Sequence, residues 1–184
     1  MKNKKQKVLI VLNRFNVGGP SFNVAFLVKH LDFKKFETLL IGGKEDSHEK
    51  PSDYIFKNEN IEFIKLSFMR RRVSFLYDLI SLFQIIKIIY NFKPDIIHTH
   101  AAKAGLLGRL ASFFYKKNVK IIHTYHGNVF EGYFSSFKNK IILSVEKFLA
   151  KKSTKIISIS HSQKKDLIGI VVGAVKTIWS MVST

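Results

Sequence analysis

Residues 7–21 read KVLIVLNRFNVGGPS, and this stretch decides the fold class. Val8–Leu12 is a continuous apolar run, which is typical of a strand that helices cover on both faces in a parallel sheet. The glycine pair Gly18-Gly19 follows directly, and a helical pattern begins at Ser21. A strand, a glycine turn and a helix in this order predict an α/β fold.

Five further apolar runs repeat this pattern along the chain. Helical patterns separate them at about residues 21–31, 74–91, 103–115 and 136–151, with another helix start at Ser162. The six predicted strands are Val8–Leu12, Phe36–Ile41, Ile61–Leu66, Asp95–Thr99, Lys120–Tyr125 and Lys155–Ile159. Since crossovers between parallel strands are right-handed, we expect a single Rossmann-like, doubly wound parallel sheet with helices on both faces and strand order 3-2-1-4-5-6. This domain is expected to fill residues 1–167.

The composition restricts the compartment and the partners. The 184 residues carry a net charge of +18 and no cysteine, so a reducing, cytoplasmic location is the simpler expectation. The first apolar run is too short for a signal peptide. A surface this basic attracts phosphates, nucleic acid or an anionic membrane leaflet, although lysine-rich coding bias would give the same excess. No motif that reads DNA or RNA accompanies it, so we expect no nucleic-acid partner.

Two apolar segments bear on membrane contact. Leu79–Phe92 fits contact with a bilayer, but a run of this length that contains Lys87 is more typical of a core helix. Residues 168–184 form an apolar tail with one charge, and we expect a terminal strand or helix there, or a truncated or frame-shifted end. The expected location is therefore cytoplasmic, with peripheral contact on the inner face of the cell membrane.

The glycine loop is the first candidate site. Adjacent glycines let a ligand approach the backbone closely, and the helix that follows presents free amides to a phosphate or a sugar oxygen. The loop is neither GxGxxG nor a P-loop, which weighs against a dinucleotide or ATP site. The alternative is a simple glycine turn in which Ser21 caps the helix.

Histidines gather at two strand ends, IIHTH at 96–100 and IIHTYHG at 121–127. Because the strands are predicted to be parallel, we expect these residues at the same edge of the sheet as the glycine loop, where open α/β sheets bind ligands. Four histidines could suggest zinc, but no Asp, Glu or Cys stands beside them at a metal spacing, and we expect no metal. We interpret His98 and His123 as buried and hydrogen-bonded. His126 is the best candidate for chemistry, because Gly127 after it suits a tight turn that leaves the backbone open to a ligand.

Weaker candidates surround this edge, and an acceptor is the expected ligand. His100 and Ser160 lie at strand ends, and Lys103 lies at a helix start where it could meet an acceptor phosphate. The loop after His126 adds Asn128 and Glu131, although one carboxylate does not make a hydrolase pair.

The order VLIVLNRFNVGGP, KPDIIHTHAAKAGLLGRLA, KIIHTYHGNVFEGYFS and KIISISHSQKKDL resembles the N-terminal, acceptor-side domain of the retaining family-four glycosyltransferases of the GT-B fold. The resemblance covers roughly residues 8–167. It implies transfer of a sugar from a nucleotide-sugar donor to a cell-envelope saccharide or a lipid-linked acceptor, without a further cofactor. It also implies that Gly18, Gly19 and Gly127 approach the donor diphosphate, and that His126 faces the transferred sugar as a catalytic residue.

The donor side of that family has no counterpart here. The family's C-terminal domain carries two glutamates separated by seven residues, and nothing after Leu167 resembles that region. We therefore expect the fragment alone to be inactive. The alternatives are a non-catalytic basic domain that binds anionic lipid or nucleic acid, and a degraded gene product.

Overall fold

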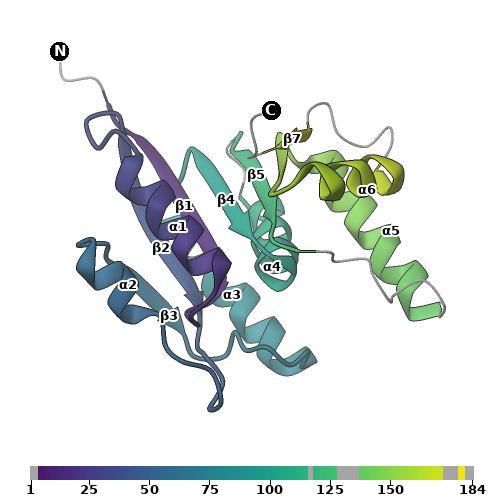
Figure 1. Cartoon of the computed structure of the whole chain (residues 1–184), viewed down its shortest axis with the longest axis horizontal. Coiled ribbons are helices and arrows are strands. Elements are labelled where there is room, and N and C mark those ends of the chain that lie inside the picture. Colours follow the sequence, from purple (N-terminus) through teal and green to yellow (C-terminus); the bar gives the residue numbers. More distant parts are fainter. Residues whose placement is uncertain (1–3, 116–117, 128–136, 172–177, 181–184) are drawn as a thin grey trace.

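The computed structural model describes residues 4–115, 118–127, 137–171 and 178–180, which form one parallel sheet with helices on both faces (Figure 1). Seven strands are hydrogen-bonded in the order β3-β2-β1-β4-β5-β6-β7. They are β1 Gln6–Arg14, β2 Phe36–Gly43, β3 Phe63–Leu66, β4 Ile96–His100, β5 Lys120–Tyr125, β6 Lys155–Ser158 and β7 Ile178–Ser180. The predicted fold class and the order of the first six strands are confirmed.

Six helices connect these strands. They are α1 Gly19–His30, α2 Asp53–Asn58, α3 Phe75–Phe92, α4 Ala102–Phe113, α5 Phe137–Lys152 and α6 His161–Val171. Helix α2 is not predicted from the sequence, because its six residues are too few to show a helical period. The predicted start of α6 is Ser162, whereas the helix begins at His161 and the Ser160 hydroxyl accepts a hydrogen bond from the Gln163 backbone N–H at 3.2 Å.

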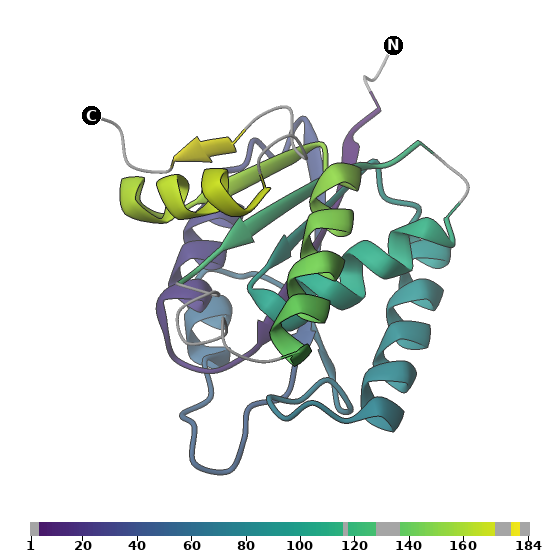
Figure 2. The same ribbon diagram turned by 90° about the vertical axis from the view of Figure 1, so that its right-hand side faces the viewer.

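Each face of the sheet has its own apolar core. On one face, Leu9, Val11 and Ile97 pack against buried residues of α3 and α4. On the other face, Val8, Ile10 and Leu12 pack against α1 and α2. Figure 2 shows helices on both sides of the strands. The continuous apolar run in β1 therefore serves two cores, which is why it lacks alternation.

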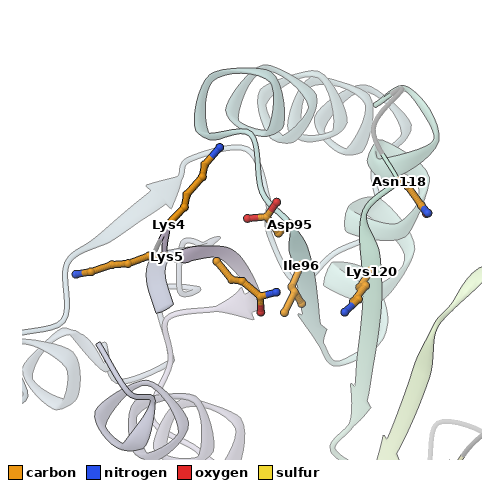
Figure 3. A pocket seen from close by; sticks show the side chains of 7 residues that line it. Lys4, Lys5, Asp95, Ile96, Asn118 and Lys120 are labelled. Carbon is orange, nitrogen blue, oxygen red and sulfur yellow. The ribbon is translucent and has the colours of Figure 1, made fainter. Parts of the chain in front are cut away.

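Asp95 fixes the strand register at the amino edge of the sheet. Its carboxylate accepts a hydrogen bond from the Lys7 backbone N–H at 2.9 Å, and its own N–H donates to the Lys7 carbonyl at 2.8 Å. Its carbonyl accepts from the Lys120 N–H at 3.0 Å. Figure 3 shows Asp95 in a shallow pocket that Lys4, Lys5 and Lys120 also line. One residue thus aligns β1, β4 and β5, and so sets where their opposite, carboxyl ends lie.

The apolar segment 168–184 belongs in part to this fold. Helix α6 continues past the expected boundary at residue 167 and ends at Val171. Residues 178–180 then pair in parallel with β6, with Ile178 opposite Ile156. In this segment the described residues are thus helical up to Val171 and form a strand at Ile178–Ser180.

Candidate functional site

The glycine loop, His100, His126 and Ser160 lie at the carboxyl edge of the sheet. In the strand register Leu12 lies opposite His100, His100 opposite Thr124, and Tyr125 opposite Ser158. The glycine loop follows β1, His126 follows β5 and Ser160 follows β6, so all of them leave the sheet at this edge. The prediction that the glycine loop and His126 share one edge is confirmed.

The glycine loop has open space around both of its glycines. Gly18 caps α1 with an extended backbone, and its carbonyl accepts the N–H of Ser21 at 3.0 Å. A Cβ at Gly18 would have no atom closer than 3.8 Å, and one at Gly19 would meet none within 4 Å. Ser21 is not the cap that the sequence suggested, because it lies inside the helix and its hydroxyl donates to the Asn16 carbonyl at 2.7 Å. The open space leaves the loop backbone accessible at the start of α1.

His100 and His126 form a pair at the ends of β4 and β5. His100 Nδ1 and His126 Nε2 are 2.9 Å apart, and the rings stack with centroids 5.2 Å apart. His100 is fully buried and its Nε2 has no hydrogen-bond partner within the described part of the chain, whereas His126 is only partly buried. Burial lowers the pKa of His126 to about 4 and the pKa of His100 well below its usual 6.5, helped by the neighbouring histidines. Both rings are therefore neutral at pH 7.

The two inner histidines are bound to threonines on opposite faces of the sheet. His98 Nε2 lies 2.8 Å from the Thr124 hydroxyl, on the face that also holds His100. His123 Nδ1 lies 2.8 Å from the Thr99 hydroxyl, on the face covered by α4. Burial lowers the pKa of His98 to about 4 and that of His123 well below its usual value. The interpretation of His98 and His123 as buried, hydrogen-bonded residues is confirmed.

A buried polar network that the sequence analysis missed supports β5 from the side of α4. Arg109 is fully buried, and its Nε donates to the Gly105 carbonyl at 2.7 Å. Its terminal nitrogen forms an ion pair with Glu146 of α5 at 2.7 Å, and the Tyr125 hydroxyl donates to the same carboxylate. Burial and the nearby Glu146 charge raise the pKa of Tyr125 well above its usual range. The only sequence signal was an arginine inside an apolar helix, and nothing in the sequence pairs it with a glutamate 37 positions away.

Gly105 is the reason that this network fits. A Cβ there would lie 2.4 Å from His123 Cε1 and 3.1 Å from an Arg109 nitrogen. The bare backbone of α4 thus lets the helix approach β5 closely enough for His123 to face it. The sequence showed this glycine only as part of the AAKAG motif.

The weaker candidates are placed as follows. Lys103 forms an ion pair with Asp78 at 2.7 Å and donates to the Arg72 carbonyl at 2.5 Å, so an acceptor phosphate would compete with Asp78 for it. The Gly127 carbonyl accepts from Gln163 Nε2 at 2.5 Å, which ties the turn after His126 to α6. Asn128 and Glu131 lie outside the described residues.

The chemistry available at this edge is that of a neutral hydrogen-bonding site. Among residues 4–115, 118–127, 137–171 and 178–180, no group of three His, Cys, Asp or Glu side chains is arranged to hold a metal ion. The site instead offers the backbone of the glycine loop, the N-terminus of α1 and the accessible ring of His126. These groups suit the oxygen atoms of a phosphate or a sugar.

Comparison with known sequences identifies relatives of this chain. The sequence model of Glycosyltransferase Family 4 matches residues 17–183. A UDP-Gal:alpha-D-GlcNAc-diphosphoundecaprenol alpha-1,3-galactosyltransferase of Escherichia coli is 32% identical over 120 residues, which cover 63% of this chain and 29% of that protein. The capsular polysaccharide biosynthesis glycosyltransferase CapM of Staphylococcus aureus is 33% identical over 100 residues, which cover 54% of this chain and 26% of that protein. The matched region thus spans less than a third of the length of these relatives.

Solved structures share the fold. The UDP-GlcNAc 2-epimerase of Neisseria meningitidis, bound to UDP-GlcNAc, superposes with a TM-score of 0.68 at 16% identity over 97% of this chain and 46% of that one. MurG of Acinetobacter baumannii superposes with a TM-score of 0.56 at 13% identity over 84% of this chain and 41% of that one. Both are proteins of the GT-B fold, and the chain corresponds in extent to about one half of each.

Proposed function

Because the chain belongs to Glycosyltransferase Family 4, we propose that it forms the acceptor-side half of an enzyme that transfers a sugar from a nucleotide-sugar donor with retention of configuration. The observation that carries the proposal is the His100–His126 pair at the edge that also holds the open glycine loop. Gly18 and Gly19 approach the donor diphosphate, and His126 meets the transferred sugar. The second half of the donor site comes from a further domain.

The relatives support the choice of acceptor. One relative is described as acting on a GlcNAc-diphosphoundecaprenol, and another as serving capsular polysaccharide biosynthesis. We therefore propose a cell-envelope saccharide or a lipid-linked saccharide as acceptor, and a nucleotide sugar as the other substrate. We further propose a reaction without a metal or other cofactor, in the cytoplasm and in peripheral contact with the inner face of the cell membrane.

The tautomer of the histidine pair supports the role of His126. A buried N–H without a partner is rarer and more costly than a buried acceptor without one. Because His100 Nε2 is buried and has no hydrogen-bond partner among the residues that the structure describes, we place the proton of His100 on Nδ1, where it is donated to His126 Nε2. His126 then carries its own proton on Nδ1. A neutral donor of fixed orientation is thereby offered to an oxygen atom of the sugar or the leaving diphosphate.

The test uses the chain joined to the donor domain of a family member, because the fragment alone is expected to be inactive. Replacing His126 by Ala should lower the turnover number roughly 100- to 1000-fold, since preorganised hydrogen-bond donors of this kind contribute about 3–4 kcal/mol to lowering a barrier. His126→Asn keeps an N–H donor and should lose less. The measurement is initial rate against donor concentration, with radiolabelled sugar.

His98→Ala is the matched control. It removes a buried ring next to the pair without touching the accessible edge, so it should lower the melting temperature while turnover per folded molecule changes less than about threefold. If the His126→Ala protein melts normally and transfers sugar at the parent rate, the histidine and Gly127 form only a turn, and the site assignment is wrong.

A further inference from the structure

Helix α3 has two apolar faces, and only one of them is used by the fold. Ser81, Ile85 and Ile89 are buried against the sheet. The opposite face is an exposed stripe at helical spacing, with 61% of Phe83 and 61% of Leu76 accessible to solvent. The other members of this outer stripe are Leu79, Lys87 and Tyr90. An exposed apolar surface of this extent on one helix marks a contact with something outside the described fold.

The charges around the outer stripe are positive. Lys87 is its one charged member, and the exposed Arg70-Arg71-Arg72 and Lys93 stand before and after the helix. The acidic residue of α3, Asp78, is turned to Lys103 in an ion pair of 2.7 Å and also accepts the Ser74 N–H at 3.1 Å. A partner of this surface therefore meets an apolar stripe that contains one lysine and has exposed basic residues before and after it along the chain.

The surface continues onto the next two helices. The Tyr90 hydroxyl donates to the Phe114 carbonyl at 2.5 Å, at the end of α4. The exposed rings of Phe113 and Phe148 contact each other edge to face, with centroids 5.8 Å apart, and so connect α4 to α5. Figure 2 shows α3, α4 and α5 on one side of the sheet.

Helix α3 has the length and composition of a membrane span, but one of its faces belongs to the protein core. Its 18 residues and mean hydropathy of 1.4 satisfy the length and composition of a membrane span. Crossing would remove Ile85 and Ile89 from the core that they complete with β1 and β4. A helix about 27 Å long with one face in a protein core and the other exposed fits the interfacial plane, where the exposed Lys87 can extend its ammonium group to the headgroups.

We propose that the outer stripe of α3, together with Arg70-Arg71-Arg72, docks this chain onto an anionic lipid bilayer. The three arginines favour the phosphate groups of the lipids, and the outer stripe enters the boundary between headgroups and acyl chains. This proposal rests on the proposed function, because it identifies the surface that makes the membrane contact proposed there. Its test requires no sugar transfer, so either proposal can fail while the other stands.

The experiment is flotation of the full chain with vesicles of phosphatidylcholine alone or with 30% phosphatidylglycerol. Binding should need the anionic lipid and weaken with salt. Replacing the three arginines by Gln should lower the partition coefficient roughly 100-fold, because each basic side chain near an anionic surface contributes about fivefold. Phe83→Ser should lower it about tenfold or more, since it removes a large exposed ring from the outer stripe.

Phe26→Ser is the matched control, because Phe26 is 65% exposed on α1, on the other side of the sheet. The charge control replaces the exposed Lys34, Lys44 and Lys57 by Gln. Equal losses in the test and control variants would overturn the proposal, as would equal binding to both vesicle types. A Phe83-dependent dimer in sedimentation that does not bind vesicles would assign the surface to a second copy and refute the lipid.

Discussion

Acidification should destabilise this protein through its buried histidines, and His98 allows the size of the effect to be worked out. Its folded-state pKa is about 4, against 6.5 in an exposed chain, because burial disfavours the charged ring. Above pH 6.5 the ring is neutral in both states and contributes no pH dependence. As the pH falls from 6.5 toward 4, His98 binds a proton in the unfolded chain but stays neutral in the folded protein, so the free energy of unfolding decreases.

The loss due to His98 alone is about 2.5 kcal/mol between pH 7.5 and pH 4.5, at about 1.36 kcal/mol per pH unit. Replacing His98 by Gln keeps a polar partner for the Thr124 hydroxyl but removes the titrating ring. The variant should be about 1–2 kcal/mol less stable at pH 7.5, because its packing is imperfect. Its stability should then fall by about 2.5 kcal/mol less than the parent's on going to pH 4.5.

The assay is urea unfolding followed by far-UV circular dichroism at four pH values from 7.5 to 4.5. His48→Gln is the control substitution, because His48 is exposed in the loop after β2. Identical pH dependence in the parent and the His98→Gln protein would refute the reasoning, since His98 would then bind protons equally in both states.

Two further predictions concern the network beneath β5. Gly105→Ala should destabilise the fold by about 2–3 kcal/mol in thermal unfolding, because its Cβ would overlap His123, whereas Gly19→Ala meets open space and should change little. Arg109→Leu leaves Glu146 without its cation and should lower the free energy of unfolding in urea by about 3–5 kcal/mol. A double variant that also carries Glu146→Leu should recover much of this loss. No recovery would mean that the ion pair does not hold the two helices together.

The fold was predictable because its signals are local. The run Val8–Leu12 is apolar throughout since it faces two cores, and that pattern alone marks a central parallel strand. Helix α2 was not predictable, because one and a half turns are too short to show a helical period. The predicted cap of α1, Ser21, was wrong, because the helix begins earlier, with Gly18 at the cap position and no side-chain hydrogen bond there.

Only those parts of the site that lie at strand ends were predictable from the sequence. Parallel topology brings His100 and His126 to one edge, but their 2.9 Å contact also depends on the conformation of the chain after β5. The Arg109–Glu146 pair depends on how α4 and α5 pack, and no periodicity in either helix encodes that packing. The tautomer that we propose for this pair likewise depends on the burial of His100 Nε2, which only the tertiary structure reveals.

The strand order also has a consequence for how the chain folds. The centre of the sheet joins Lys7 to Asp95, which lie 88 positions apart, while β1, β2 and β3 need only neighbouring sequence to pair. Contacts that close such long loops slow folding, so formation in milliseconds to seconds is expected. A nascent chain that ends before β4 therefore presents β1 as an open strand edge beside an uncovered apolar face. Such an edge readily pairs with other chains, and the newly made N-terminal segment depends on prompt synthesis of β4 to avoid aggregation.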